Sequence, residues 1–310
     1  MAHSASNGSA AAPAGQRTKV IYVMGAGRSG STILGVTLGN CADVFYAGEL
    51  DAWLARSGSP QLDDETRVRF WAGVREHVDG ASELFGKEAQ VSIERSIALF
   101  RVHKWPTRRR LRGAYKKVTE RLYRAVSGAA GTPVIVDTSH YPLRARELRS
   151  LPDVDLYLIY LMRDPQSVVA SFNRKDVQQY TKSTFTTNVY LWLTNLLAVG
   201  VFLRHPRDRR LFVRYEDFIA DPERILGDIL ETVGAGELPL DLAHLRTGLA
   251  FQGNRLIRTE VIALSGEPAR SARPSAVTAV MQLPWTTLLG RLRPLAGDGH
   301  PGEFEHAHRQ

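Results

Sequence analysis

A glycine-punctuated stretch near the start of the chain, Gly25-Ala26-Gly27-Arg28-Ser29-Gly30-Ser31-Thr32, has the residue types of an anion-binding loop. The apolar residues from Val20 to Met24 run into it as a strand, and apolar residues recur from Ile33 to Leu38 as on a buried helix. A loop between a strand and a helix points successive backbone N–H groups and the positive end of the helix dipole at one place. We therefore expect a phosphate-like group to bind there.

Three signatures fit this loop. The spacing Gly25-x-Gly27-x-x-Gly30 satisfies the dinucleotide-binding fingerprint, and Glu49 follows after about 20 residues, where an acid that binds ribose would stand. The spacing Gly25-x-x-x-x-Gly30-Ser31-Thr32 is a Walker-A frame in which a serine replaces the lysine. Gly-Arg-Ser-Gly-Ser-Thr after a strand also resembles the 5′-phosphosulfate loop of sulfotransferases that use 3′-phosphoadenosine-5′-phosphosulfate (PAPS). That resemblance implies cofactor contacts from Gly27, Arg28, Ser29, Gly30, Ser31 and Thr32, and a catalytic role for Arg28.

A second candidate anion site follows the apolar run from Leu156 to Met162, which is typical of a strand buried on both faces of a parallel sheet. The run ends in Arg163-Asp164-Pro165, and Pro165 can open a helix. Arg163 and Ser171, about two turns into that helix, can point at one ligand, where the guanidinium gives bidentate phosphate contact and the hydroxyl adds a donor. On its own, Arg163 could equally pair with a carboxylate at the sheet edge.

The motif Arg-Asp-Pro-x-x-Val-x-x-Ser resembles the 3′-phosphate motif of PAPS-dependent sulfotransferases, and neither dinucleotide enzymes nor P-loop kinases call for it. PAPS is anionic at both ends, so a protein that binds it needs two separate anion sites. Gly253-Asn254-Arg255 and Arg258 resemble the late loop that can close over the nucleotide in this family, and the spacing does not choose between the two arginines. The resemblance implies PAPS as cofactor, adenosine 3′,5′-bisphosphate as product, and no metal.

Transfer to a hydroxyl requires a general base near the sulfuryl group. Gly48-Glu49, at the end of an apolar segment, matches the glutamate that carbohydrate and bacterial members of the family use as base, which makes Glu49 the first candidate. His103, in Arg-Val-His-Lys-Trp-Pro, is the second, because cytosolic members use a histidine after a comparable segment.

A further strand, residues 133–136, ends in Asp137-Thr138-Ser139-His140. Asp137 would be the Walker-B aspartate of a kinase, whereas a strand ending in Asp-x-Ser also resembles the sulfotransferase pattern. His140 stands where that pattern carries a lysine. It is either a site residue, and then a third candidate base, or part of a turn before Pro142.

Between about residues 60 and 130 the pattern is helical and polar, which predicts a helical insertion. Its densest cationic cluster, from Arg108 to Lys117, is interpreted as a solvated helix face or as a rim that attracts acidic acceptors or a lipid surface. No nucleic-acid-binding motif surrounds the cluster, so no nucleic-acid partner is expected. The run from Leu191 to Leu203 predicts a buried helix too short to span a membrane. Tyr190 and Trp192 are predicted to be core residues, with lining of an acceptor pocket as the alternative.

Composition sets the remaining expectations. Forty Lys and Arg against 32 Asp and Glu give a net charge of +8, which favours anionic ligands. The single Cys41 excludes an intramolecular disulfide and suits a reducing, cytoplasmic setting. Residues 1–17 have the composition of a disordered tail without signal-peptide features, so one domain is expected over residues 18–310, its segment after about residue 273 unassigned.

The sequence therefore predicts an α/β fold, with a mostly parallel sheet flanked by helices in a three-layer, P-loop-kinase-like architecture. The predicted function is in-line transfer of a sulfuryl group from PAPS to a hydroxyl of a small-molecule, glycan or lipid acceptor, with a general base. One alternative is a P-loop kinase or nucleotidase that uses ATP and Mg²⁺ with Asp137. The other is a non-catalytic module that binds polyanions.

Overall fold

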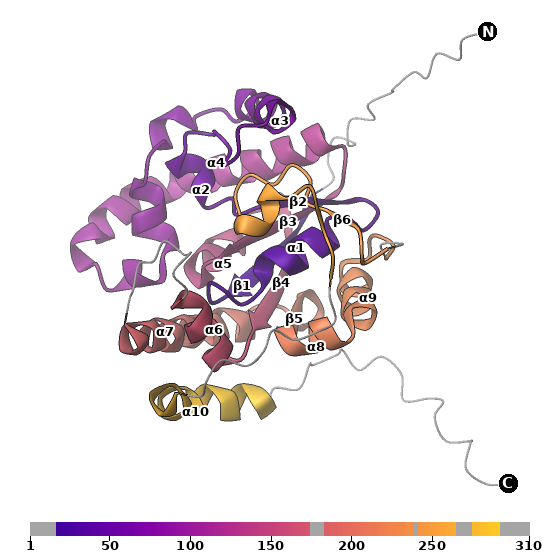
Figure 1. The fold of residues 1–310 in the computed structure, drawn as a ribbon. Coiled ribbons are helices and arrows are strands. Elements are labelled where there is room, and N and C mark those ends of the chain that lie inside the picture. The colour runs from indigo at the N-terminus through magenta and orange to yellow at the C-terminus, as the bar shows by residue number, and fades with distance from the viewer. Residues whose placement is uncertain (1–16, 174–182, 239–240, 265–274, 292–310) are drawn as a thin grey trace, which may run out of the picture.

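A five-stranded parallel sheet forms the centre of the protein in the computed structural model, which describes residues 17–173, 183–238, 241–264 and 275–291 (Figure 1). The strand order is β2-β3-β1-β4-β5, and all neighbouring pairs are parallel, as the sequence predicts. The strands are β1 (Thr18–Gly25), β2 (Val44–Gly48), β3 (Val134–His140), β4 (Val154–Met162) and β5 (Arg210–Arg214).

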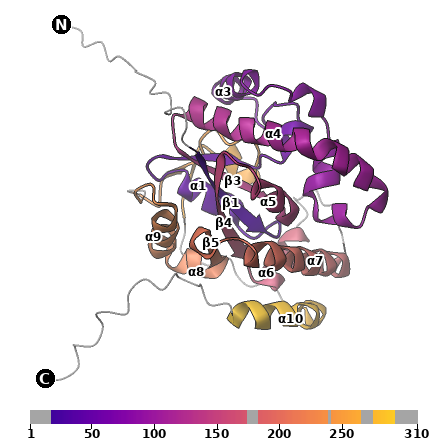
Figure 2. The ribbon, with the colours of Figure 1, turned by 180° about the vertical axis from the view of Figure 1, so that it is seen from behind.

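Both faces of the sheet are buried, which explains why β1 reads as an unbroken apolar run. Val20, Tyr22 and Met24 point into one core, and Ile21 and Val23 point into the other. The first core lies under α3 (Glu65–Glu76), α4 (Trp105–Ala130), α5 (Pro142–Leu148) and α7 (Thr184–Leu203). The second lies under α1 (Ser31–Leu38), α8 (Tyr215–Ala220) and α9 (Pro222–Val233). Figures 1 and 2 show these layers from opposite sides, and the predicted three-layer architecture is confirmed.

The regular elements described between β2 and β3 are all helices or helical turns, in agreement with the helical pattern of this segment. It contains α2 (Ala52–Ala55), α3, the short turns η1 (Ser82–Leu84), η2 (Gln90–Glu94), η3 (Ser96–Leu99) and η4 (Val102–Lys104), and then α4. Asp64 caps α3 by accepting from the N–H of Arg67 at 3.0 Å, and α4 ends at Gly131 in the left-handed conformation.

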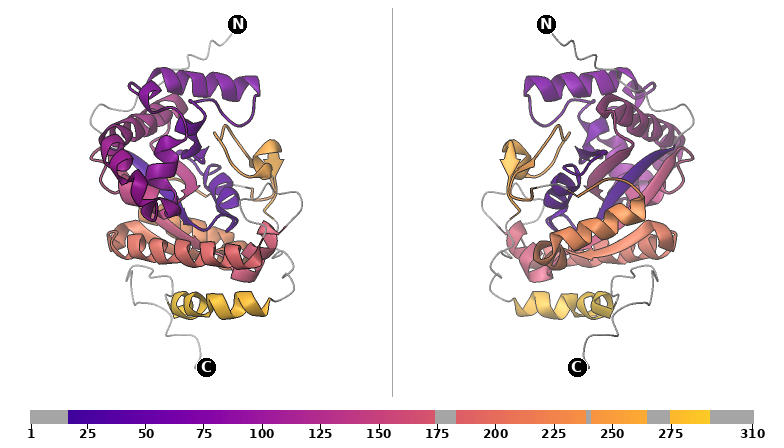
Figure 3. Two further views of the ribbon diagram at one scale, coloured as in Figure 1. Left: turned by 90° about the vertical axis from the view of Figure 1, so that its left-hand side faces the viewer. Right: turned by 90° about the vertical axis from the view of Figure 1, so that its right-hand side faces the viewer.

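The second half of the chain adds α6 (Pro165–Phe172), η5 (Arg207–Arg209), η6 (Arg255–Arg258), α10 (Ala276–Arg291) and a small antiparallel pair, β6 (Leu245–Arg246) with β7 (Val261–Ile262). The sequence patterns did not predict α10, which packs on α7 as the outermost layer in both views of Figure 3. The predicted disordered tail lies outside the described residues except for Arg17.

Helix α7 differs from its prediction in length. It begins at Thr184, upstream of the apolar run, and among the described helices it alone is long and apolar enough to cross a membrane. It packs on α5, α6, α10, β1 and β4, so 44% of its most apolar stretch is buried inside the fold. The prediction that Trp192 is a core residue is wrong, because its side chain is 40% exposed and lies against Trp285 of α10.

Candidate active site

Parallel pairing brings the carboxyl ends of four strands to one edge of the sheet. The first loop, residues 26–30, follows β1, Glu49 follows β2, His140 ends β3 and Arg163 follows β4. In an open α/β sheet, ligands bind in the crevice outside these strand ends, at the strands where the connections change faces. Here the connection after β1 is α1, in the second core, whereas α5 after β3 lies in the first core. The crevice is therefore expected beside β1, where the candidate residues gather.

The first loop has a backbone suited to an anion. Gly30 is left-handed, with φ 95°, and is the N-cap of α1, but no side chain caps the helix and its first turn contains no acidic residue. The first N–H groups of α1 therefore have no acceptor within the helix or from a cap, and they face the loop together with the helix dipole. Arg28 is also left-handed, with φ 71°, and its side chain is half-buried.

Arg163 is held against this loop. Its Nη1 donates to the backbone oxygen of Arg28 at 3.3 Å, and its guanidinium lies over the ring of Tyr215, 4.5 Å from the centroid. The nearby Glu216 accepts from the N–H of Asp164 at 2.8 Å instead. Across the described part of the chain Arg163 forms no ion pair with a carboxylate, so that alternative is not supported there. Ser171 lies half-buried on α6, the helix that Asp164 caps through Ser167 N–H at 2.9 Å.

Glu49 lies at the same edge of the sheet, and the pKa of its carboxyl group is raised. Burial and the neighbouring Asp51 raise the pKa of Glu49 to about 7, against the opposing effects of a hydrogen bond from Gln252 and the charge of Arg28. Gln252 Nε2 donates to Glu49 Oε2 at 3.2 Å, and the N–H of Glu49 donates to the Gln252 carbonyl at 2.8 Å. A carboxylate with a pKa near neutrality, close to a guanidinium at the carboxyl edge of the sheet, has the properties of a general base.

The late loop contacts the start of α1, which directly follows the first loop. The N–H of Asn254 donates to Thr32 Oγ1 at 3.4 Å, and the adjacent Gln252 binds Glu49. Gly48, with φ 82°, allows this approach, since a Cβ there would stand 2.3 Å from the Gln252 carbonyl oxygen. Arg255 and Arg258 both lie exposed on η6, directly after this contact.

Comparison with known proteins supplies the family. Residues 20–236 match the sulfotransferase family, a span that includes the first loop, Glu49 and the Arg163 motif. The chain belongs to the sulfotransferase family. No curated protein sequence matches it significantly.

Two solved structures resemble the fold of this sulfotransferase. The sulfotransferase domain from the curacin biosynthetic pathway has a TM-score of 0.55 and 17% identity, covering 89% of this chain and 98% of that domain. The sulfotransferase domain of the Synechococcus PCC 7002 olefin synthase has a TM-score of 0.50 and 19% identity, covering 88% and 97%. At these identities the likeness concerns the fold.

The two predicted histidines of the sulfotransferase lie in different surroundings. His103 is exposed on η4, and within the described residues no hydrogen bond or ion pair joins it to the first loop or to Glu49. His140 instead lies beside the first loop, its Nε2 3.9 Å from the position of a Cβ on Gly27. Burial lowers the pKa of His140 to about 4, helped by the charge of Arg28. The imidazole is therefore neutral at pH 7.

Sequence reasoning did not predict the contacts of three side chains of this site. Tyr190, predicted to be core, is half-buried on α7, and its hydroxyl accepts from the N–H of Gly27 at 3.1 Å. Tyr215, predicted to be structural, packs on both Gly30 and Arg163. Gln252 contacts Glu49. Each comes from an element remote in sequence, so no local spacing signals its position.

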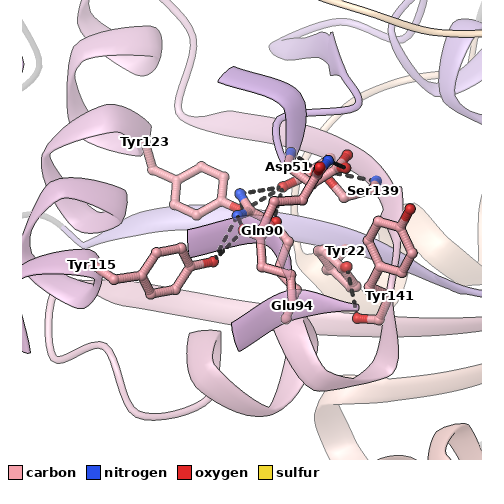
Figure 4. Close-up of polar contacts among 10 residues, drawn as sticks. Tyr22, Asp51, Gln90, Glu94, Tyr115, Tyr123, Ser139 and Tyr141 are labelled. Atoms are coloured by element: carbon pink, nitrogen blue, oxygen red, sulfur yellow. Dashed lines mark hydrogen bonds and ion pairs between the residues drawn. The ribbon is translucent and has the colours of Figure 1, made fainter. Parts of the chain in front are cut away.

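A buried polar network supports the site from the first core (Figure 4). Arg144 of α5 is 2% exposed and donates to Asp137 Oδ2 at 3.1 Å, to Tyr115 at 2.8 Å and to Glu94 Oε1 at 2.5 Å. Tyr115 and Tyr123 point from α4 toward the same carboxylates, donating to Glu94 at 2.6 Å and Asp137 at 2.5 Å. Through Glu94, Tyr115 and Tyr123, the helical insertion is thus hydrogen-bonded to Arg144 and to Asp137 on β3.

The network continues to the turn that carries Glu49. Ser139 donates through its N–H and its Oγ to Asp137 Oδ1, and its Oγ accepts from the N–H of Asp51 at 2.9 Å. Gln90 Nε2 donates to Asp51 Oδ2 at 2.7 Å. Because the two oxygens of Asp137 accept from Arg144, Tyr123 and Ser139, this carboxylate is not free to hold Mg²⁺. The position therefore does not support the kinase alternative.

Proposed function

We propose that this sulfotransferase uses PAPS to sulfate an acceptor hydroxyl, with Glu49 as general base. PAPS supplies an activated sulfuryl group between two anionic ends. The observation that carries the proposal is the contact between Arg163 and the first loop, because it puts two separate anion-binding elements side by side. The residues present fit the cofactor: α1 has an uncapped N-terminus, and Arg163 has no carboxylate partner among the described residues.

Each group in the crevice then has a role that its chemistry supports. The N–H groups from Ser29 to Thr32 and the Arg28 guanidinium stabilise the 5′-phosphosulfate end and the charge that develops on the leaving oxygen. Arg163 and Ser171 bind the 3′-phosphate, with either Arg255 or Arg258 closing from the late loop. Glu49 removes the proton from the acceptor hydroxyl. The acceptor is a small molecule, glycan or lipid, and we place the reaction in the cytoplasm.

Calorimetric titration with adenosine 3′,5′-bisphosphate in EDTA tests the two-site proposal. Arg163→Ala removes charge-assisted hydrogen bonds worth about 1.5–3 kcal/mol, so we expect Kd to rise roughly 10- to 100-fold. Arg163→Lys keeps the charge without the planar fork and should lie between the two. The matched control is Arg224→Ala, which removes an exposed arginine of α9 and should leave Kd unchanged. Preference for ATP that requires Mg²⁺ and ignores Arg163→Ala would instead support a kinase.

Gly30→Ala tests whether the loop conformation matters for binding. A Cβ at this left-handed position would stand 2.3 Å from two carbons of the Tyr215 ring, on which Arg163 lies. Moving that ring displaces the guanidinium, and the backbone strain adds about 1 kcal/mol or more, so we expect a Kd for the bisphosphate at least about tenfold higher. Gly73→Ala in α3, where a Cβ meets nothing within 4 Å, is the control. Equal affinities of both variants would contradict the assigned loop geometry.

A further inference from the structure

The outer surface of α7 and α10 is apolar and uncharged. Exposed apolar side chains recur at helical spacing along one face of α7: Phe185, Val189, Trp192 and Leu196. Helix α10 exposes Val277, Val280, Leu283 and Leu288, with exposures of 73% at Val280 and 61% at Leu283. No Asp, Glu, Lys or Arg occurs in 184–203 or in 276–290. We call these eight residues the apolar face. A contiguous patch of this kind marks an interaction site more often than scattered apolar residues do.

Helix α10 is seated with polar residues inward. Thr278 and Gln282 are 0% and 1% exposed. Gln282 Nε2 donates to Asn188 Oδ1 at 3.0 Å, and Asn188 Nδ2 donates to Thr278 Oγ1 at 3.0 Å. These bonds, together with the contact between Trp192 and Trp285, fix α10 on α7 (Figure 3). Val277, Val280, Leu283 and Leu288 are left exposed, whereas Leu289 is buried. Water is a poor solvent for the surface that this packing exposes.

The apolar surface continues onto the insertion. Turn η3 contacts α7, and four exposed residues lie on η3, directly after it, on η4 and at the start of α4: Ile97, Phe100, Val102 and Trp105. The left view of Figure 3 shows these elements, α7 and α10 on one side of the molecule. Exposed tryptophan and phenylalanine beside aliphatic side chains are typical of the water–membrane boundary.

Beside Trp105, cationic side chains outnumber the carboxylates that pair with them. Trp105, Gly113, Arg108, Arg109, Arg112 and Lys116 line an open cavity of about 440 Å³. Glu147 is fully buried below and accepts from Arg108 at 3.0 Å and Arg112 at 2.6 Å, with Lys116 3.9 Å away. One carboxylate thus serves several cations, and within the described residues Arg109 and Arg110 form no ion pair. The cavity suits an anionic headgroup.

From these observations we infer that this side of the protein binds an anionic lipid membrane, with the apolar face and Trp105 at the bilayer surface and phosphate headgroups at the α4 cations. Burial of exposed apolar side chains and attraction of the cations act together in such binding. A second copy of the chain fits less well. The segments 95–119, 184–203 and 276–290 contain no Asp or Glu, so a self-contact of this surface would bring cations together without carboxylates.

Vesicle flotation tests the inference on the full chain. We expect binding to vesicles of phosphatidylcholine containing one third phosphatidylglycerol, at least about tenfold weaker binding to phosphatidylcholine alone, and weakening by salt. Arg109→Glu and Arg110→Glu should each weaken binding about fivefold or more, because each cation contributes to adsorption. Leu283→Ser should weaken it by removing buried apolar area. Arg224→Glu, a charge reversal on α9, is the matched control and should bind as the wild type does.

The readouts separate this inference from its rivals. The thermal unfolding temperature of each variant tests whether the fold is kept. This measurement depends neither on activity nor on PAPS binding. Equal binding to neutral and anionic vesicles, or to neither, would overturn the inference. The inference would also be overturned if sedimentation velocity showed a dimer that Leu283→Ser dissociates and the wild type did not bind vesicles. Binding to polyglutamate without binding to vesicles would point to an acidic protein partner and overturn it as well.

Discussion

Replacing Glu49 by glutamine is expected to lower kcat by about 10²- to 10⁴-fold, the contribution typical of a positioned general base. Glutamine keeps the size of the side chain and an oxygen that can accept from Gln252 Nε2, which now lies 3.2 Å from Glu49 Oε2. It cannot take a proton from an alcohol. The affinity for adenosine 3′,5′-bisphosphate should therefore stay within a few-fold while turnover collapses. Glu65→Gln, at an exposed carboxylate of α3, is the control and should leave kcat unchanged.

The pH dependence of kcat gives the same residue a second, independent signature. The pKa of Glu49 is raised to about 7, and only the carboxylate form accepts a proton, so the rate should rise with pH through about 7 and level off above it. In Glu49→Gln this inflection should disappear. If kcat of the variant stays within a few-fold of the wild type and keeps the inflection, Glu49 is not the base. His140, beside the first loop, is then the next residue to replace.

The placement of the first loop, Glu49 and the Arg163 motif at one edge of the sheet was predictable because their signals are local. The first loop and the Arg163 motif each follow a continuous apolar strand and precede a helix, so a short window of sequence contains both the residues and the elements that position them. Parallel pairing of the strands then determines at which edge of the sheet these residues lie. Once β1, β2 and β4 belong to one parallel sheet, their carboxyl ends share an edge, and the segments that carry Arg28, Glu49 and Arg163 lie at that edge.

The remaining side chains depend on packing between distant elements. Tyr190 reaches Gly27 only because α7 packs on β1 and β4, and its apolar neighbours made it read as core. Tyr215 begins α8, and its position on Gly30 depends on how β5 pairs with β4. The sequence patterns did not predict α10 because both of its faces are mixed. Thr278 and Gln282 face the protein together with Trp285 and Leu289, whereas Val280 and Leu283 face outward. A pattern rule that assigns apolar residues to the interior misreads such a helix.

The buried network is a further feature that a linear pattern cannot show, because Arg144, Glu94 and Asp137 come from three separate elements. Burial raises the pKa of Glu94 to about 7 and that of Asp51 to about 6, and in both cases the charge of Arg144 opposes the rise. A single, almost fully buried guanidinium thus compensates several carboxylates. Removing one partner of a buried ion pair costs about 3–5 kcal/mol, because the other charge is left uncompensated.

We therefore expect Arg144→Met to lower the free energy of unfolding by about 3–5 kcal/mol above pH 7, measured by urea denaturation. The sign of the pH dependence follows from Glu94. Its pKa is higher in the folded state than its ordinary value of 4.5, so the stability it contributes is present below that value and is lost as pH rises through the folded pKa. Without Arg144 the folded pKa rises further, and the loss extends to higher pH. The deficit of the variant should accordingly be larger at about pH 8.5 than at about pH 6.

Arg224→Met is the matched control for this measurement, because Arg224 forms exposed ion pairs with Asp221 at 3.1 Å and Asp228 at 3.4 Å. Solvent screening limits the contribution of such pairs to about 1 kcal/mol or less, and the change should not grow with pH. Through Ser139 the network also reaches Asp51, which is two residues from Glu49 in the sequence. The fraction of the Arg144→Met variant that remains folded should therefore show a shifted pH profile of kcat. A destabilisation below about 1 kcal/mol with an unchanged profile would mean that the tyrosines and Gln90 hold the carboxylates without the guanidinium.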